Sequence, residues 1–474
     1  MKKTILFALV LLCLLGLAKA ENLKISLAKP LQPYAQNRLL VDSPKEGLLT
    51  LTIKSRAVDW VIARDVPVIA GQNELVYDGL HINGEPLHGG RFTLSATLAT
   101  AGEEQSFETD LQVSRPLAVL QYALPRGELL YLRGGKFEVD VYKTRSVATE
   151  ITLFKRGEAP QTGVPVRFIQ DKNQTLLFSW DGKVNGKPIA PGDYVLRFAV
   201  NKGEGGQVDI PLTALDEAPP HYPVQVTPKG DFLPETLDDA TVWQAMMAPI
   251  TVVESDQVYR QNIYTKPDTK SPVSGQVSSQ TAGLKVLRLE GDFAYIGAYN
   301  HKDGAYFEGY VKLDRLKTYK PNTRWGLLLN KAAQTMTVYR DGKPIGSTKI
   351  STGLMLRYAT RQETRAGAFL VGQRLPYFDN LGYRYRYAMR VDGFNLVHQL
   401  GHPISGTMNF DVEDAVMGQK ASHGCIRIDR FPGEGGINAF WLWTNIPSHT
   451  KMLVLDDKDV RHAQLAKFGL PITD

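Results

Sequence analysis

Short segments in which apolar and polar residues alternate make up most of the chain. The segments 90–96 (GRFTLSA) and 192–199 (GDYVLRFA) are two examples. Alternation with a period of two is typical of β-strands with one buried face, and Asp-Gly, Asn-Gly and Pro-Gly turn signals separate the segments. Helical periodicity is scarce, and the clearest exception is LDDATVWQAMM at 237–247. The pattern therefore predicts a mostly β, multidomain chain with one short helix.

An internal repeat covers the first half of the chain. VYDGLHINGEPLHGGRFTLSA (76–96) matches SWDGKVNGKPIAPGDYVLRFA (179–199), and both contain an Asn-Gly pair that favours a tight hairpin. We expect two β-sandwiches, at 21–115 and 116–214, which resemble immunoglobulin-type domains such as the Ig-like domain of flagellar hook-capping proteins. The equivalent positions are Asn83-Gly84 with Asn185-Gly186, and Gly90-Arg91-Phe92 with Gly192-Asp193-Tyr194.

The second half divides into a linker and two further domains, because a chain of this length exceeds one core. Residues 215–249 are rich in Pro and acidic residues and form a linker with the short helix. Residues 250–320 resemble a bacterial SH3-type barrel, on the segments GDFAYI and EGYVKLDRL. The last domain spans 321–457, and 458–474 is a polar tail. Early in this domain we expect a hairpin around Asp341-Gly342, in which Met336 and Val338 alternate with Thr335, Thr337 and Tyr339.

The first 20 residues predict a secretory signal peptide. Lys2 and Lys3 precede an apolar run, and Ala18-Lys19-Ala20 is a small-x-small cleavage site. An uncleaved anchor is the alternative, although a spanning helix needs ~20 apolar residues. A lipid anchor on Cys13 is another, but Leu12 stands where a small residue is expected. No other long apolar run is present, so we expect no transmembrane segment after cleavage.

Charge adds little. The formal net charge is +6, and cleavage after Ala20 removes three lysines, which leaves 52 basic against 49 acidic residues. A net charge of about +3, dispersed along the chain, does not indicate a nucleic-acid partner. It is compatible with an acidic polymer.

The candidate chemistry centres on Cys425 in ASHGCIRI (421–428), the only cysteine left after cleavage. An unpaired thiol in an exported protein indicates a reactive group or an intermolecular disulfide. Only the thiolate is a strong nucleophile, and a neighbouring histidine can take the proton. We favour His398 as the base, because a histidine distant in sequence can approach the sulfur from any direction. We assign a structural or orienting role to His423.

Two further residues of the segment suit acyl transfer. Gly424 carries no side chain, so backbone N–H groups there are able to face an oxyanion. Arg427 would bind a substrate carboxylate through two parallel hydrogen bonds. Other interpretations stay open at this point: a buried structural thiol, a redox thiol, His402 as the base, or a zinc site made by His398, His402, His423 and Cys425.

SHGCIRI resembles the signature of the L,D-transpeptidase catalytic domain of the YkuD type. The likeness spans about 130 residues and includes TVYRDGKPIGSTKISTG (337–353), TRAGAF (364–369), RYAMRVDGFNLVHQ (386–399) and MGQKASHGCIRI (417–428). The resemblance implies peptidoglycan chemistry. A thiolate attacks the amide between the third residue of the stem peptide and the D-alanine that follows it, and the acyl group passes to an amine, giving a 3-3 cross-link, D-amino acid exchange or protein anchoring.

The same resemblance implies residue roles. Cys425 is the nucleophile and His398 the general base, with His423 completing the catalytic motif. Ser422 and Gly424 complete the motif around the oxyanion hole, Arg427 is a substrate-binding position, and Tyr387 and Met389 line the approach. No metal or organic cofactor is implied.

Three departures from the family pattern stand out. Gln399 follows His398 where Gly or Ser is preferred. The 23 residues between His398 and Ser422 exceed the usual spacing, so 402–420 forms an extra loop or lid, with Asp411, Glu413 and Asp414 in it. TRAG replaces a proline-containing turn.

The expected partners are peptidoglycan stem peptides and, through the Ig-like domains, other cell-envelope proteins. The expected location is the periplasm, in association with the cell wall. Two alternatives remain: an L,D-carboxypeptidase or amide hydrolase that uses the same cysteine, and a non-catalytic cell-wall-binding or scaffold protein.

Overall fold

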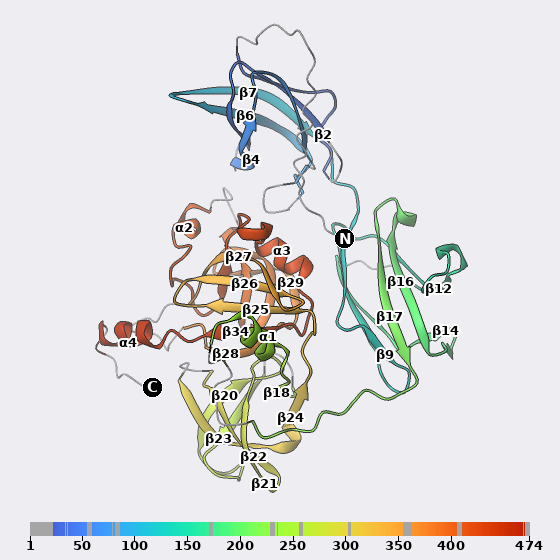
Figure 1. Cartoon of the computed structure of the whole chain (residues 1–474), viewed down its shortest axis with the longest axis vertical. Helices are drawn as coiled ribbons and strands as arrows, with labels where there is room; N and C mark the ends of the chain where they lie inside the picture. Colours follow the sequence, from blue (N-terminus) through green and yellow to red (C-terminus); the bar gives the residue numbers. More distant parts are fainter. Residues whose placement is uncertain are drawn as a thin grey trace.

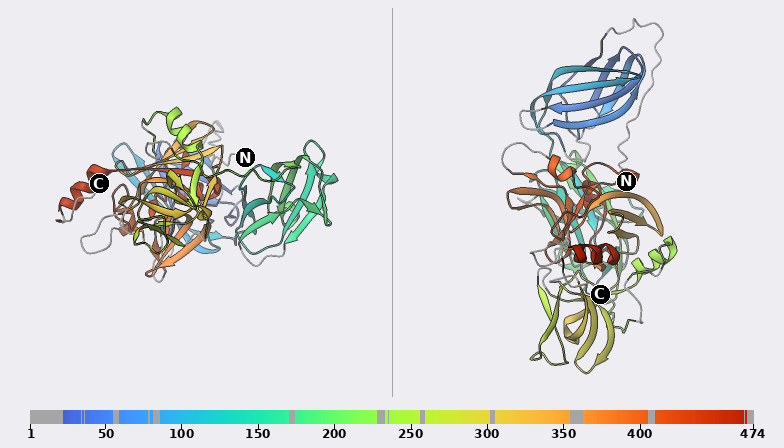
Figure 2. Two further views of the ribbon diagram at one scale, coloured as in Figure 1. Left: turned by 90° about the horizontal axis from the view of Figure 1, so that it is seen from below. Right: turned by 90° about the vertical axis from the view of Figure 1, so that its left-hand side faces the viewer.

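The protein is mostly β and multidomain (Figure 1). Four β-rich units follow one another along the chain: two sandwiches, a small β-domain and a C-terminal domain. The first sandwich lies at one end of the long axis and the small β-domain at the other, with the C-terminal domain between them (Figures 1 and 2). The computed structural model describes residues 22–33, 35, 37–54, 59–77, 79–80, 86–169, 174–227, 233–234, 236–255, 259–301, 305–353, 363–404, 410–467 and 469.

The first sandwich packs a three-stranded sheet (β1-β2-β5) against a four-stranded sheet (β4-β3-β6-β7). Alternate residues of these strands enter one apolar core, as the period-two pattern predicts. The strands are β1 (Lys24–Leu27), β2 (Asn37–Ser43), β3 (Gly47–Lys54), β4 (Asp59–Val68), β5 (Gly71–Tyr77), β6 (Gly90–Thr100) and β7 (Glu103–Val113).

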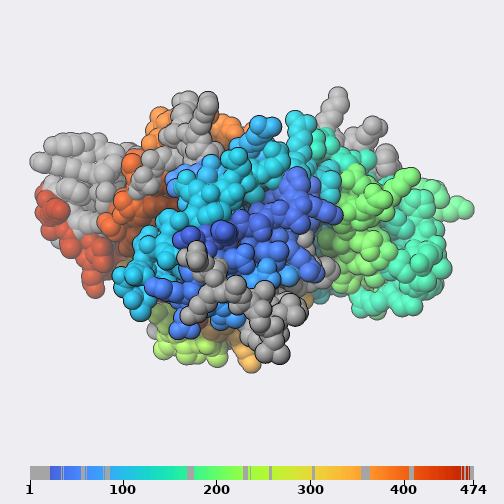
Figure 3. Space-filling view, turned by 90° about the horizontal axis from the view of Figure 1, so that it is seen from above, coloured from blue at the N-terminus to red at the C-terminus, as the bar shows by residue number. Residues whose placement is uncertain are grey.

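The second sandwich packs β13-β10-β8 against β12-β11-β16-β17-β9 around its own core. In the view from the side of the first sandwich, it lies on one flank (Figure 3). Its strands are β8 (Leu120–Pro125), β9 (Leu129–Tyr131), β10 (Phe137–Lys143), β11 (Thr149–Lys155), β12 (Val164–Ile169), β13 (Thr175–Trp180), β14 (Lys183–Val184), β15 (Lys187–Pro188), β16 (Gly192–Val200) and β17 (Gln207–Leu215), with 3-10 turns η1 (Pro160–Thr162) and η2 (Asn201–Gly203).

The sequence repeat has a structural counterpart. Gly90 opens β6 and Gly192 opens β16, with φ of 155° and 148°, values that suit glycine. Asn185 and Gly186 join β14 to β15 with φ of 51° and 77°, which confirms a tight hairpin turn there. Asn83-Gly84 lies outside the described residues. The likeness of the two sandwiches to immunoglobulin domains stays a prediction.

The predicted short helix is confirmed as α1 (Asp239–Met247), which begins two residues later than expected. Asp238 caps it, since its Oδ1 accepts a hydrogen bond from the Thr241 N–H at 3.0 Å. The small β-domain follows with a five-stranded sheet, β20-β19-β23-β22-β21, and a strand pair, β18-β24. Its likeness to SH3-type barrels stays a prediction. Its elements are β18 (Ile250–Val253), β19 (Arg260–Tyr264), β20 (Val273–Ser278), β21 (Lys285–Glu290), β22 (Phe293–Tyr299), β23 (Tyr306–Lys312), η3 (Leu313–Arg315) and β24 (Leu316–Tyr319).

The C-terminal domain is built on one large sheet in the order β28-β34-β25-β26-β27-β33-β31-β30-β29, and β32 pairs with β30. Two pairs are parallel, β25 with β34 and β31 with β33. The elements are β25 (Trp325–Asn330), β26 (Thr335–Arg340), β27 (Lys343–Ser351), β28 (Gly367–Leu370), β29 (Arg374–Asn380), β30 (Tyr383–Asp392), β31 (Asn395–Gln399), β32 (His402–Pro403), α2 (Asp411–Asp414), β33 (Ile426–Ile428), η4 (Glu434–Gly436), α3 (Ala439–Asn445) and β34 (Lys451–Leu455).

The hairpin at Asp341-Gly342 is confirmed, with φ of 49° and 86° at the two turn residues. Met336 and Val338 are buried. Tyr339, from the alternate set, is buried as well. The reason is α1, which covers this part of the sheet: the Tyr339 hydroxyl donates to Asp239 Oδ1 at 2.8 Å.

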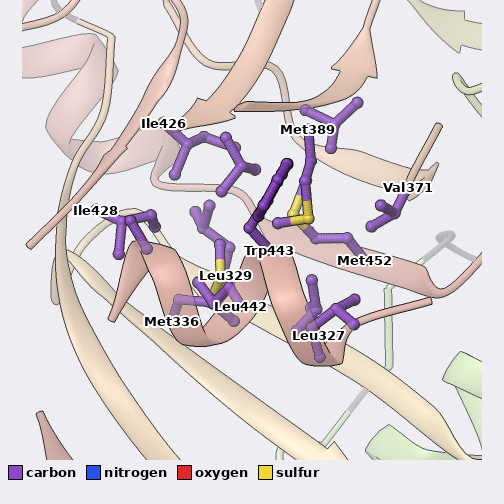
Figure 4. Packing of buried hydrophobic residues seen from close by; sticks show 14 of the residues in the cluster. Leu327, Leu329, Met336, Val371, Met389, Ile426, Ile428, Leu442, Trp443 and Met452 are labelled. Carbon is purple, nitrogen blue, oxygen red and sulfur yellow. The ribbon is translucent and has the colours of Figure 1, made fainter. Parts of the chain in front are cut away.

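Trp443 of α3 fills the centre of the core of the C-terminal domain (Figure 4). Its side chain is completely buried against apolar residues from several strands. The residues labelled around it in Figure 4 are Leu327, Leu329, Met336, Val371, Met389, Ile426, Ile428, Leu442 and Met452.

The tail contains a helix, α4 (Lys458–Lys467), that sequence patterning did not predict. Residues 1–20 of the predicted signal peptide and 470–474 lie outside the described residues. Within the described part of the chain, no helix is both long enough and apolar enough to span a membrane.

Candidate functional site

Two parallel strands bring the predicted catalytic residues together. In the register of β31 and β33, Val397 lies opposite Ile426 and His398 opposite Arg427. Val397 and Ile426 enter the core, so His398 and Arg427 lie on the opposite face of the sheet. Cys425 immediately precedes β33, two residues before Arg427, which places it on that same face.

Cys425 is half-buried, and its sulfur lies beside the turn that leads into β31. The thiol is 4.0 Å from the Phe394 carbonyl oxygen, and the Leu396 backbone N–H donates to the sulfur. Burial raises the pKa of Cys425, and the Leu396 N–H together with the positive charges of Arg427 and Arg390 offsets part of that rise. The resting group at neutral pH is therefore the thiol.

A backbone carbonyl orients the imidazole of His398. Its Nδ1 lies 2.6 Å from the Gln399 carbonyl oxygen, so Nδ1 carries the proton and Nε2 is the basic nitrogen. The atom that orients the imidazole is the backbone carbonyl oxygen of Gln399. The glutamine side chain, which stands where the family prefers Gly or Ser, therefore does not prevent this contact. Burial lowers the pKa of His398 to about 4, which keeps the imidazole neutral and able to accept a proton at neutral pH.

Two aromatic rings cover His398. The rings of Phe378 and Tyr385 stand edge-on to the imidazole at centroid distances of 5.3 Å and 4.8 Å. They come from β29 and β30 and stack on each other at 5.0 Å. They restrict water around the base and limit the positions its ring can adopt.

The loop before Cys425 is fixed by its own hydrogen bonds. Ser422 Oγ donates to the Cys425 carbonyl oxygen at 2.5 Å and accepts from the Gly424 N–H at 3.3 Å. Gly424 has φ of 108°, a conformation that favours glycine. A Cβ there would lie 2.7 Å from Asn395 Oδ1, so the position has no room for a side chain.

Thr364 ties this loop to two other segments. Its hydroxyl donates to the Gly424 carbonyl at 3.0 Å and accepts from the Gly353 N–H at 2.9 Å. A small cavity adjoins the contact, with Thr364, Asn395 and Gly424 in its wall. Thr364 opens the TRAG turn that departs from the family pattern, and its position in that turn was the sequence signal that could have identified it.

Arg427 is already paired. Its Nη1 lies 3.0 Å from Glu413 Oε2, and both side chains are largely buried. The neighbouring Asp414 pairs with Arg430 at 2.6 Å. Sequence reasoning placed Arg427 on a substrate carboxylate and the acids in a free loop, and it missed both pairs. Residues 405–409 of the expected lid and the side chain of Asp411 lie outside the described residues.

Comparison with known proteins identifies one family in the C-terminal part of the chain. Residues 324–458 match the family YkuD, described as the L,D-transpeptidase catalytic domain. The C-terminal domain is of the YkuD type. No curated protein matched the chain.

Several solved structures are similar to parts of the chain. One is the L,D-transpeptidase (residues 123–326) from Xylanimonas cellulosilytica, with 19% identity and a TM-score of 0.22, covering 28% of this chain and 60% of that one. Another is an L,D-transpeptidase from Mycobacterium smegmatis, with 16% identity and a TM-score of 0.23, covering 44% and 92%. A third, an L,D-transpeptidase from Mycobacterium tuberculosis H37Rv, gives the same four values. The chain thus spans about three fifths of the first of these.

The other two histidines of the expected site, His402 and His423, lie on other segments of the YkuD domain than His398. His402 pairs with Arg384 on β30, while Leu396, next to Cys425, pairs with Arg390. Six residues along a strand correspond to ~20 Å. His423 is exposed. Among the described residues, no three His, Cys, Asp or Glu side chains are grouped as around a metal ion.

Tyr387 and Met389 do not line an approach to Cys425, and this part of the expected site is wrong. Met389 is completely buried and Tyr387 is 6% exposed, and both belong to the core of the YkuD domain. Tyr387 packs on Phe440 and Trp443, with centroid distances of 4.9 Å and 5.4 Å. Sequence alone did not show which face of β30 is covered by α3.

Proposed function

We propose that the protein is an exported peptidoglycan L,D-transpeptidase with Cys425 as nucleophile and His398 as general base. One observation carries the proposal: β31 and β33 pair in parallel inside a domain of the YkuD type, with His398 opposite Arg427, two residues after Cys425. The neutral imidazole, with Nε2 free of the Gln399 carbonyl, supports the assignment of the base.

The proposed first step forms a thioester. As Sγ of Cys425 attacks the carbonyl carbon of the third stem residue, its proton passes to His398 Nε2. The bond from that carbon to the nitrogen of the following D-alanine then breaks, and His398 gives the proton to the leaving amine. Backbone N–H groups around Gly424 and Cys425 would stabilise the oxyanion.

In the second step an amine attacks the thioester. The new amide forms, the carbon–sulfur bond breaks, and the proton of the amine returns through His398 to the sulfur. A stem-peptide amine gives a 3-3 cross-link, a D-amino acid gives exchange, and a protein amine gives anchoring. Water in place of the amine would make the protein a carboxypeptidase. Glu413 and Asp414 are paired with arginines and so do not offer a free carboxylate for an acceptor ammonium.

The test incubates purified protein with tetrapeptide muropeptides and identifies the products by mass spectrometry. We expect 3-3 dimers with the wild type and none with Cys425→Ala. His398→Ala should lower turnover by a factor of about 100 or more, the size expected for loss of a general base. The matched control, His402→Ala, should retain most activity.

Other products would decide between the alternatives. Tripeptides without dimers would establish a hydrolase. No turnover, together with no covalent carbapenem adduct on Cys425, would contradict an enzymatic role and favour a cell-wall-binding scaffold. The same proposal includes a periplasmic location, which cell fractionation tests. It also includes binding of envelope proteins by the two sandwiches, which is tested by pull-down with the wild type and with variants that carry substitutions on the surface of the sandwiches.

A further inference from the structure

The small β-domain meets the YkuD domain beside the nucleophile. The contact is made by the turn between β30 and β31. A Cβ on Gly393 of this turn would lie 2.8 Å from Ser278 Oγ of the small β-domain. Arg365 Nη1 donates to the His301 carbonyl at 2.7 Å across the same contact, and Arg365 is also paired with Asp392. The turn is therefore fixed against the small β-domain.

One residue of the turn connects this contact to Cys425. The carbonyl oxygen of Phe394 lies 4.0 Å from the Cys425 sulfur, while the residue as a whole is 59% exposed. The guanidinium of Arg260, from β19 of the small β-domain, lies 5.6 Å from the centroid of that ring. A cation at this distance is attracted by the ring, which limits its orientation. A positive charge from another domain thus stands at the rim of the reactive site.

Arg260 differs from the other arginines near the site. Arg427, Arg430 and Arg365 pair with Glu413, Asp414 and Asp392. Arg390 is buried and donates to the Gly393 carbonyl oxygen. Arg260 is exposed and has no acidic partner among the described residues. A guanidinium without a carboxylate partner, oriented by an aromatic ring, suits two-point binding of a carboxylate from a ligand.

We propose that Arg260 binds a carboxylate of the peptide acyl donor, so that the small β-domain determines part of the substrate specificity of the YkuD domain. This inference rests on the proposed function. The ligand class is an anionic peptide whose amide carbonyl reaches Cys425 while its carboxylate reaches Arg260. Arg427 is unsuited to that role in this structure because its guanidinium is already paired with Glu413.

The first experiment compares peptides of different charge. Tetrapeptide donors with free carboxylates and the same donors with amidated carboxylates are given to the wild type, Arg260→Ala and Arg260→Lys. We expect Arg260→Ala to lower kcat/KM by about tenfold for the anionic donor and to leave the amidated donor unchanged. Arg260→Lys keeps the positive charge but cannot donate two parallel hydrogen bonds to a carboxylate. It should therefore retain part of the kcat/KM that Arg260→Ala loses.

The control is Arg315→Ala, which removes an exposed arginine from the same small β-domain. It should leave both donors unchanged. An equal effect of Arg260→Ala on the two donors would overturn the proposal, because a structural role alone affects both.

A second experiment does not depend on the proposed function. Cys425 is alkylated with anionic iodoacetate and with neutral iodoacetamide, and the ratio of the two rates is compared between wild type and Arg260→Ala. Loss of the cation over the Phe394 ring, at the rim of the site, should lower this ratio by about threefold. An unchanged ratio would overturn the inference. A changed ratio in a protein that does not turn over muropeptides would reject the proposed function while retaining an anion-binding Arg260.

Discussion

The thiol of Cys425 and the imidazole of His398 are both uncharged at neutral pH. Burial raises the pKa of the thiol and lowers that of the imidazole, so each group is displaced away from its charged form. A preformed thiolate–imidazolium pair would need the opposite pKa shifts: a lowered pKa for the thiol and a raised pKa for the imidazole. The proton would therefore move to His398 only when the substrate is attacked.

This gives a pH prediction for Cys425. The thiolate fraction grows with pH until the raised pKa is passed, so alkylation by iodoacetamide should increase about tenfold per pH unit from pH 7 to 9 without levelling off. Mass spectrometry of the labelled protein measures the rate, and Cys425→Ala gives the background. A plateau below pH 8 would show that an ion pair exists at rest, contrary to this expectation.

At the scale of elements, one buried lysine joins three segments of the YkuD domain. Lys331 follows β25, and its Nζ lies 3.1 Å from Glu363 and 2.8 Å from Asp457, which follows β34. Lys420, five residues before Cys425, pairs with the same two acids. Burial favours the neutral carboxyl, but the two lysines outweigh it and lower the pKa of Asp457 to about 2. The cluster thus connects the edge of the sheet to the nucleophile loop.

Replacing Lys331 by Met should destabilise the domain. It leaves two buried carboxylates with a single lysine, and breaking a buried pair in this way costs about 3 to 5 kcal/mol. Urea unfolding measures the loss. Lys343→Met, at an exposed position of β27, is the matched control and should change the free energy of unfolding by less than about 0.5 kcal/mol. Equal stability of the two variants would refute the role of the cluster.

At the scale of the whole molecule, the second sandwich extends the core of the YkuD domain. Tyr122 is 4% exposed and packs on Trp443 at a centroid distance of 5.2 Å. Asp140 of β10 accepts a hydrogen bond from Ser448 Oγ at 3.1 Å and lies 3.7 Å from Arg374. The two units therefore share an interface that is both apolar and ionic, and we expect them to unfold together.

Tyr122→Ala tests that coupling. It removes a large side chain from the shared core, so the free energy of unfolding of the YkuD domain should fall by about 3 kcal/mol. Hydrogen exchange of the backbone amides, read by mass spectrometry separately for peptides of β25 and β34 and for peptides of β10 and β16, follows the two units one by one. Tyr222→Ala removes an exposed ring of the linker and should have little effect. If Tyr122→Ala lowers only the stability of the sandwich, the two units fold independently.

The local sequence pattern predicted the features that depend on neighbouring residues alone. The strands, the Asn185-Gly186 and Asp341-Gly342 turns and the helix at 239–247 follow from periodicity and turn chemistry. The burial of Met389, the pairing of Arg427 with Glu413 and the insertion of Tyr122 into another domain's core depend on segments distant in sequence. The residues next to them in sequence give no indication of which distant residues they contact. The choice of His398 as the base rested on its distance in sequence from Cys425 and on the family resemblance, and its pairing opposite Arg427 became visible only in the structure.

The parallel pairing of β25 with β34 has a consequence for the order of events during synthesis. Residues 326–330 are partnered by 451–455, so the sheet that carries β33 is incomplete until the chain has been made past residue 455. Contacts between such distant segments form late, since their loop must close first. Until then β28 lacks its neighbouring strand, since β34 lies between β28 and β25 in the sheet. The domain that carries Cys425 would thus be complete, and its chemistry would begin, only after nearly the whole chain has been made.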